Sequence, residues 1–196
     1  MIVRIMPLSG MILVNDMQYG LYDLANQSLT TLNVTNYPGY DSTNMLDQHM
    51  LMGRSNDGKL LLSTSTGCGQ GLTTCSNVIY QSTDGNTWTS LISGYTAFNI
   101  SRDKNAFAGW VTSNNYANPA VIRLSDLDVQ EVLPISGTDR VNIHVLKNSD
   151  LAFGTAYNSN SNSTTTTAIR WTRTGGTEAL SNFSLPTGYV INYLPD

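Results

Sequence analysis

The stretch Gln81–Trp88, QSTDGNTW, brings together residue types that can do chemistry: the Ser82 hydroxyl, the Asp84 carboxylate and the large Trp88 ring. A carboxylate beside a hydroxyl is the usual material of acid–base or nucleophilic catalysis. The same residues also suit a tight turn, because a turn Asp accepts backbone N–H bonds and a following Gly takes φ > 0 without steric cost. We interpret the stretch as a structural turn.

The other reactive residue types are few. The two cysteines, Cys68 and Cys75, are separated by residues rich in Gly and Thr, a spacing that suits a disulfide across the neck of a loop; two unrelated free thiols are the alternative. A disulfide would indicate an oxidising compartment. The two histidines, His49 and His144, lie far apart and are interpreted as structural. The sequence therefore predicts no metal site and no cofactor.

Composition narrows the class of protein. Charged residues make up only 12% of the 196 residues and the net charge is −4, so the surface must be polar through Ser, Thr and Asn, as is common in exported proteins. We expect a secreted, periplasmic or cell-surface protein. Nucleic-acid binding is not expected, because it needs clustered Lys and Arg. No apolar run approaches the ~18 residues of a membrane span. The N-terminal stretch MIVRIMPLSGMILVND favours strand–turn–strand over a signal peptide.

Short β-type runs recur along the chain, whereas helical periodicity is nearly absent. A turn followed by a strand returns about every 45 residues, which is the period of a four-stranded propeller blade. The copies are Ser9–Asn15, Asp57–Ser63, Asp103–Gly109 and Asn148–Gly154. A second element ending in a hydroxyl residue follows each of the last three: Ile79–Ser82, Ile122–Ser125 and Ile169–Thr172.

These repeats predict an all-β protein, a β-propeller or propeller fragment of about four four-stranded antiparallel blades in a single domain, 1–196. The repeats run approximately over 1–34, 47–92, 97–133 and 141–182. The stretch GYVINYL, Gly188–Leu194, reads as a surplus C-terminal strand (188–194), the first strand of a fifth repeat.

The stretch STDGNTW resembles the Asp-box, or BNR repeat, of sialidase-like β-propellers, with the pattern Ser-x-Asp-x-Gly-x-Thr-Trp. The matching residues are Ser82, Asp84, Gly85, Thr87 and Trp88, but the match is one residue short because Asp84 and Gly85 are adjacent. Degenerate copies begin at Ser125 and Thr172 and lack the aromatic residue. The resemblance implies a fold-stabilising turn between the third and fourth strands of a blade, on the side away from an active site.

If the tight turns occupy one face, the longer loops occupy the other. Tyrosines there can stack on a sugar ring while Asn and Asp bind its hydroxyls. The alternative is that tyrosines are simply frequent in loops of secreted β proteins and never converge. The candidate ligand-binding residues are Tyr37, Tyr40, Asp41, Asn114, Tyr116, Tyr157 and Asn158.

The resemblance implies that an active site of the sialidase type would need an arginine cluster and a Tyr–Glu pair. Arg54, Arg102 and Arg173 fall beside tight turns, and the only glutamates, Glu131 and Glu178, occupy the Trp88 position of degenerate copies. We therefore expect a non-catalytic binding or structural module that contacts a glycan or protein partner. The alternatives are a subunit of a larger extracellular assembly, or homo-oligomer, joined through the C-terminal strand, and part of a glycan-processing enzyme.

Overall fold

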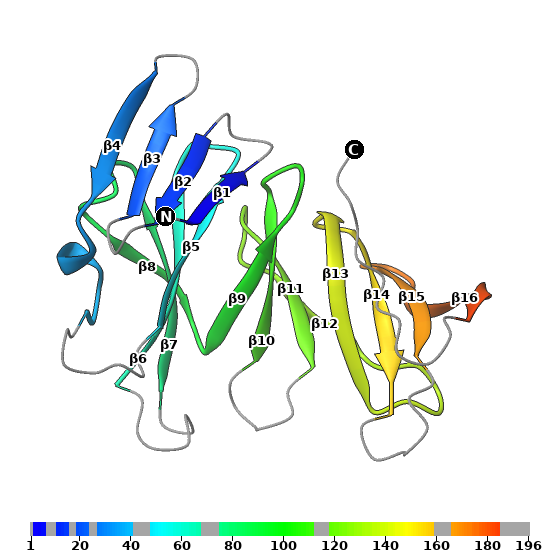
Figure 1. Cartoon of the computed structure of the whole chain (residues 1–196). Coiled ribbons are helices and arrows are strands. Elements are labelled where there is room, and N and C mark those ends of the chain that lie inside the picture. The colour runs from blue at the N-terminus through cyan, green and yellow to red at the C-terminus, as the bar shows by residue number, and fades with distance from the viewer. Residues whose placement is uncertain are drawn as a thin grey trace. The chain divides into compact units, whose positions relative to one another are not determined.

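The computed structural model describes residues 2–6, 11–15, 19–23, 27–40, 48–67, 75–111, 118–158 and 166–184. These residues form β-strands, turns and one short 3-10 helix, η1 (Val34–Asn36) (Figure 1). The strands make four sheets of four strands each. The first sheet holds β1 (Ile2–Met6), β2 (Met11–Asn15), β3 (Tyr19–Asp23) and β4 (Ser28–Leu32). The second holds β5 (Gln48–Arg54), β6 (Leu60–Thr66), β7 (Ser76–Ser82) and β8 (Thr89–Ser93).

The third sheet holds β9 (Tyr95–Ile100), β10 (Ala106–Val111), β11 (Pro119–Arg123) and β12 (Val129–Glu131). The fourth holds β13 (Arg140–Asn148), β14 (Leu151–Tyr157), β15 (Thr167–Thr172) and β16 (Gly176–Ser184). In every sheet the strands lie side by side in chain order, so each sheet is a meander. The predicted fold class, four four-stranded antiparallel repeats, is confirmed. The predicted strand Gly188–Leu194 lies outside the described residues.

The contacts divide the chain into two compact units, Met1–Thr96 and Ala97–Asp196, and the single domain 1–196 stays a prediction. The first unit contains β1–β8 and the second contains β10–β16, and the division falls within β9. Each unit is described below by itself.

The tight turns explain why the strands start where they do. Gly58 takes φ +84° in the turn from β5 to β6, a conformation that costs glycine little. In the turn from β9 to β10 the corresponding role falls to Lys104, at φ +59°. A hydroxyl residue opens both turns: Ser55 Oγ and Ser101 Oγ accept backbone N–H bonds from the start of the following strand.

In the first unit, the core forms on both faces of β6. Leu60, Leu61 and Leu62 are each at most 1% exposed. Because side chains alternate across a strand, Leu60 and Leu62 share one face with Thr66, while Leu61 points to the other. Leu32 at the end of β4 is fully buried and lies against the Leu60 face, where it contacts the β7–β8 turn at Gly85.

In the second unit, the core lies between the two sheets. It joins β10 and β11 to one face of β13–β15, and its buried residues are Ala106, Ala108, Val121, Val132, Val141, Ile143, Leu146, Ala152, Ala156, Ile169 and Trp171. The pairing of β13 with β14 is irregular between Ile143 and Val145, so His144 is an extra residue in a β-bulge. Opposite the bulge stands Gly154, where a Cβ atom would lie 1.9 Å from the Asn142 backbone oxygen.

Candidate functional site

The turn that contains Asp84 is closed by its own hydrogen bonds. The Ser82 hydroxyl donates to Asp84 Oδ1 (2.9 Å) and accepts the Gly85 N–H (2.8 Å). Asp84 Oδ1 also accepts the backbone N–H groups of Thr87 (2.8 Å) and Asn86 (2.9 Å). These bonds, that of Thr87 first, lower the pKa of Asp84 to about 2. Asp84 thus accepts backbone N–H bonds of its own turn, as predicted. A carboxylate held as an anion by backbone donors is a poor general acid at neutral pH.

Gly85 and Trp88, the other members of this turn, also contribute to the structure. Gly85 takes φ +77° and is buried, as a turn of this kind requires. The half-buried Trp88 ring packs edge-on against Tyr37, with ring centroids 5.4 Å apart. Trp88 Nε1 is buried without a hydrogen-bond partner in the described part of the chain. The Trp88 ring therefore joins the turn to the segment that precedes β5.

Tyr37 is not an exposed ligand-binding residue, and that prediction is wrong. Its side chain is only 3% exposed, because its ring lies between Trp88 and His49. The residue before it, Asn36, donates from Nδ2 to Asn86 Oδ1 of the Asp84 turn (3.1 Å). Thus Tyr37, predicted on the loop face, and its neighbour Asn36 instead pack against a tight turn.

We call residues 32–40 the strap, because they run along the Leu60 face of the second sheet. At one end Leu32 meets Gly85, and at the other Gly39 lies against the Thr66 side chain. Between these ends, His49 Nε2 lies 3.2 Å from the Pro38 carbonyl oxygen. The strap therefore covers part of the Leu60 face of the second sheet.

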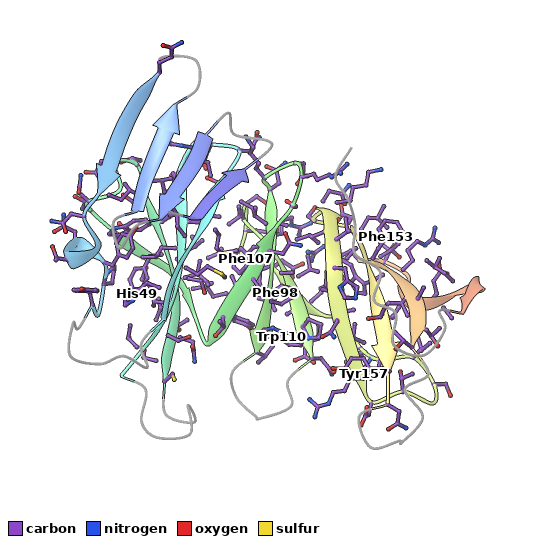
Figure 2. The ribbon with its side chains drawn as sticks, in the orientation of Figure 1. His49, Phe98, Phe107, Trp110, Phe153 and Tyr157 are labelled. Carbon is purple, nitrogen blue, oxygen red and sulfur yellow. The ribbon has the colours of Figure 1, made fainter. Side chains whose placement is uncertain are left out.

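Tyr40, at the end of the strap, does reach the surface. Its side chain is 41% exposed, and its ring centroid lies 6.0 Å from that of His49 (Figure 2 labels His49). The neighbouring candidate Asp41 lies outside the described residues. Ligand binding at Tyr40 stays a prediction.

In the second unit, Arg173 ties three tight turns together. Its side chain is 8% exposed and forms ion pairs with Asp128, from the β11–β12 turn, and with Asp150 (3.2 Å), from the β13–β14 turn. Arg173 Nε also donates to the Ser149 carbonyl (3.0 Å). Arg123 extends this network to Asp126 (2.8 Å), which lowers the pKa of Asp126. These contacts place the tight turns of this unit at one end, which we call the turn end.

The opposite, loop end of the second unit carries Tyr157 at the end of β14 (Figure 2). Tyr157 is half-buried and its neighbour Asn158 is exposed. The Asp139 N–H donates to the Tyr157 carbonyl (3.1 Å). Arg140 of β13 lies opposite Tyr157 of β14 in the register of the two antiparallel strands. Tyr157 and Asn158 are therefore brought together with Asp139 and Arg140. The candidates Asn114 and Tyr116 lie outside the described residues.

A repeated turn motif escaped the sequence analysis. In the β5–β6 turn the Ser55 hydroxyl bonds Asp57, and in the β9–β10 turn the Ser101 hydroxyl donates to Asp103 (2.6 Å). The pKa of Asp57 is lowered, first by its bond with Lys59. The signal was present as Ser-x-Asp at corresponding positions of two repeats, the same spacing as Ser82 and Asp84.

His144 and Cys75, which also have reactive side chains, both interact within the protein. His144 Nε2 lies 2.9 Å from Thr155 Oγ1, and burial lowers the pKa of His144. Cys75 is not a free thiol in this structure, while Cys68 lies outside the described residues. Among the residues described, no group of three or more His, Cys, Asp and Glu could hold a metal ion. Within the same residues, no helix has the length and hydrophobicity needed to cross a membrane.

Sheets of four antiparallel strands in chain order define an all-β chain of the β-propeller type. Its fold is similar to TolB from Acinetobacter baumannii, with a TM-score of 0.54, 14% identity, and coverage of 87% of this chain and 40% of that one. A putative TolB from Agrobacterium tumefaciens has a TM-score of 0.49 at 15% identity, over 86% of this chain and 61% of that one. An acylaminoacyl peptidase from Pyrococcus horikoshii has a TM-score of 0.49 at 15% identity, over 75% and 26% of the two chains.

No protein-family model and no curated protein sequence matches the chain. At the identities of these solved structures the likeness establishes the fold alone. The chain spans less than two thirds of the length of each of them.

Proposed function

We propose that this protein is an exported, non-catalytic binding module whose loop end contacts a glycan. The proposal depends mainly on one observation: Tyr157 stands at the end of a core strand, fixed through its carbonyl by the Asp139 N–H, with Asn158 exposed beside it. An aromatic ring on a rigid element, flanked by carboxylate and amide groups, suits the apolar face and the hydroxyls of a sugar.

The contrast with the tight turns of each unit supports the choice of the loop end. Asp84 is hydrogen-bonded within its own turn, and Asp128 and Asp150 are paired with Arg173. Glu178 is paired with Arg170. The three aspartates have structural roles and Glu178 is held in an exposed ion pair, which favours a non-catalytic protein. Hydrolysis of a fluorogenic glycoside by the purified chain would contradict this part of the proposal.

A glycan array probed with the full chain tests the binding. We expect a signal that Tyr157→Ala abolishes and Tyr157→Phe largely retains, because the ring supplies the stacking surface. Leu180→Ala is the control, since Leu180 is an exposed apolar residue (37%) that lies within β16. No signal from the full chain, or a signal unchanged in Tyr157→Ala, refutes glycan binding at this end.

Two finer proposals accompany this one. The hydrogen bonds around Asp84 and Gly85 support a relationship of this turn to the Asp-box, although the spacing is one residue short. The state of Cys75 supports a Cys68–Cys75 disulfide, which agrees with export to an oxidising compartment. Peptide mapping without reduction tests the disulfide: a Cys68–Cys75 cross-linked peptide is expected, and two alkylated free thiols would refute it.

A further inference from the structure

The strap carries an exposed asparagine that a hydroxyl residue follows two positions later. Residues 33–35, Asn-Val-Thr, match the pattern Asn-x-Ser/Thr, whose asparagine amide accepts an N-linked glycan in exported proteins. The pattern is short and occurs by chance, so the local structure decides which copy can be modified. Two copies have side chains that the structure describes, residues 33–35 and residues 99–101.

In the first copy both polar side chains are on the surface. Asn33 and Thr35 are exposed. The Thr35 hydroxyl and the Thr35 N–H both donate to Asn33 Oδ1, at 2.7 Å and 3.1 Å. These bonds hold the hydroxyl beside the amide. Within the described part of the chain Asn33 Nδ2 donates no hydrogen bond, so the nitrogen that would carry a glycan is not used by the fold.

The backbone around Asn33 is held in place while its side chain stays outside. Leu32, directly before it, is fully buried, and Tyr37, four positions after it, is 3% exposed. The Asn33 carbonyl accepts the Asn36 N–H (3.0 Å). Because the buried neighbours hold the strap and the Asn33 side chain takes no part in the core, an attached sugar chain would displace no core contact.

The second copy has the opposite surroundings. Asn99 is half-buried within β9, and its Nδ2 donates to the His144 carbonyl (3.4 Å). Ser101 is 1% exposed; its hydroxyl donates to Asp103 (2.6 Å) and accepts the Ala106 N–H (2.9 Å). Both polar side chains of this copy are therefore used by the fold. A glycan on Asn99 would remove a contact of β9, so a folded chain should not carry one.

We propose that Asn33 is a modification site, the acceptor of an N-linked glycan when the chain passes through a secretory compartment. The donor is an oligosaccharide linked to a polyprenyl diphosphate. A bond forms between Asn33 Nδ2 and C1 of the first sugar, the bond from C1 to the diphosphate oxygen breaks, and the amide nitrogen loses one proton. The site rests on the proposed export and is independent of glycan binding at Tyr157, which belongs to the other unit.

Secretion of the full chain from a eukaryotic host tests the site. An added N-terminal secretion signal brings the chain into the compartment, so acceptance at Asn33 is measured separately from export; the chain without that signal tests export itself. Glycopeptide mapping of the folded, secreted protein should find a glycan at Asn33 in most chains and none at Asn99. Treatment with peptide-N-glycosidase should lower the mass of the Asn33 peptide by that of the glycan.

Three variants separate the modification from the fold. Asn33→Asp keeps an oxygen that Thr35 can bond, and it should be secreted without a glycan at this position. Thr35→Val keeps the shape of the side chain but removes its hydroxyl, and it should also abolish the modification, whereas Thr35→Ser should retain it.

The result at the two copies decides the proposal. An unmodified Asn33 in the folded, secreted chain overturns it. So does a glycan on Asn99 at equal occupancy, because the local structure would then select nothing. A chain that stays in the cell is extracted and mapped in the same way, with circular dichroism to confirm that it is folded, and the same two outcomes apply.

Discussion

The contact between the strap and the Asp84 turn can be tested with two glycines. Gly85 and Gly58 both stand in tight turns after an Asp and both have positive φ, +77° and +84°. They differ in what surrounds them. A Cβ atom at Gly85 would lie 2.3 Å from Leu32 Cδ2 and 3.3 Å from Leu60 Cδ1, whereas a Cβ atom at Gly58 would meet nothing within 4 Å.

The two Gly→Ala substitutions therefore share one cost and differ in another. Both force an L-residue into left-handed backbone, which costs about 1–2 kcal/mol. Only Gly85→Ala also pushes a methyl group into Leu32, which is fully buried and cannot swing into solvent. Inserting one carbon into a packed site typically costs about 1–3 kcal/mol more. We expect Gly58→Ala to lose about 1–2 kcal/mol and Gly85→Ala about 2–5 kcal/mol.

Urea unfolding, followed by tryptophan fluorescence, measures both variants on the full chain. Leu32→Ala supplies the second half of the test: it removes the clash, so the double variant Leu32→Ala/Gly85→Ala should be more stable than the sum of the single losses implies. Equal losses for Gly58→Ala and Gly85→Ala, or strictly additive losses in the double variant, would show that Leu32 does not pack on the turn.

Three further predictions concern other sites. Gly154→Ala should lower the yield of folded protein more than any surface substitution, because its Cβ would meet the Asn142 backbone oxygen; soluble expression and circular dichroism report this. Arg173→Met should cost about 1–3 kcal/mol by removing the shared partner of the carboxylates of two turns, Asp128 and Asp150. Arg170→Met, at an exposed pair, should stay within about 0.5 kcal/mol. Because the folded pKa of Asp84 is about 2 and its ordinary value is 3.8, its stabilising effect is complete above pH 3.8 and is lost as the pH falls towards 2. Urea midpoints between pH 5 and pH 2 should therefore fall less steeply in Asp84→Asn than in the native chain.

The sequence predicted what local chemistry determines. Asp84 and Gly85 specify their turn through bonds and backbone angles within a few residues, so the turn and the strands beside it could be placed from the sequence. Tyr37 was misplaced because its burial depends on Trp88 and His49, partners brought to it only by the packing of the second sheet. The Arg173 network escaped prediction for the same reason, since it joins turns that are remote in sequence. Side-chain identity alone does not distinguish an exposed loop tyrosine from one that closes a sheet face.

The low charge content of the chain and the positions of its carboxylates both indicate that charged side chains mainly stabilise turns. Only 12% of the residues are charged, and among them Asp57, Asp84 and Asp103 are each hydrogen-bonded to a serine hydroxyl inside the turn they stabilise. A turn closed in this way offers a ligand few unsatisfied groups, because its N–H donors already face a carboxylate. Recognition of a neutral sugar would then depend on the Tyr157 ring and on hydrogen bonds to Asn158 and Asp139, without ion pairs. A partner bound through such groups should be held with little dependence on salt, and insensitivity of the array signal to ionic strength separates this mode from ion pairing.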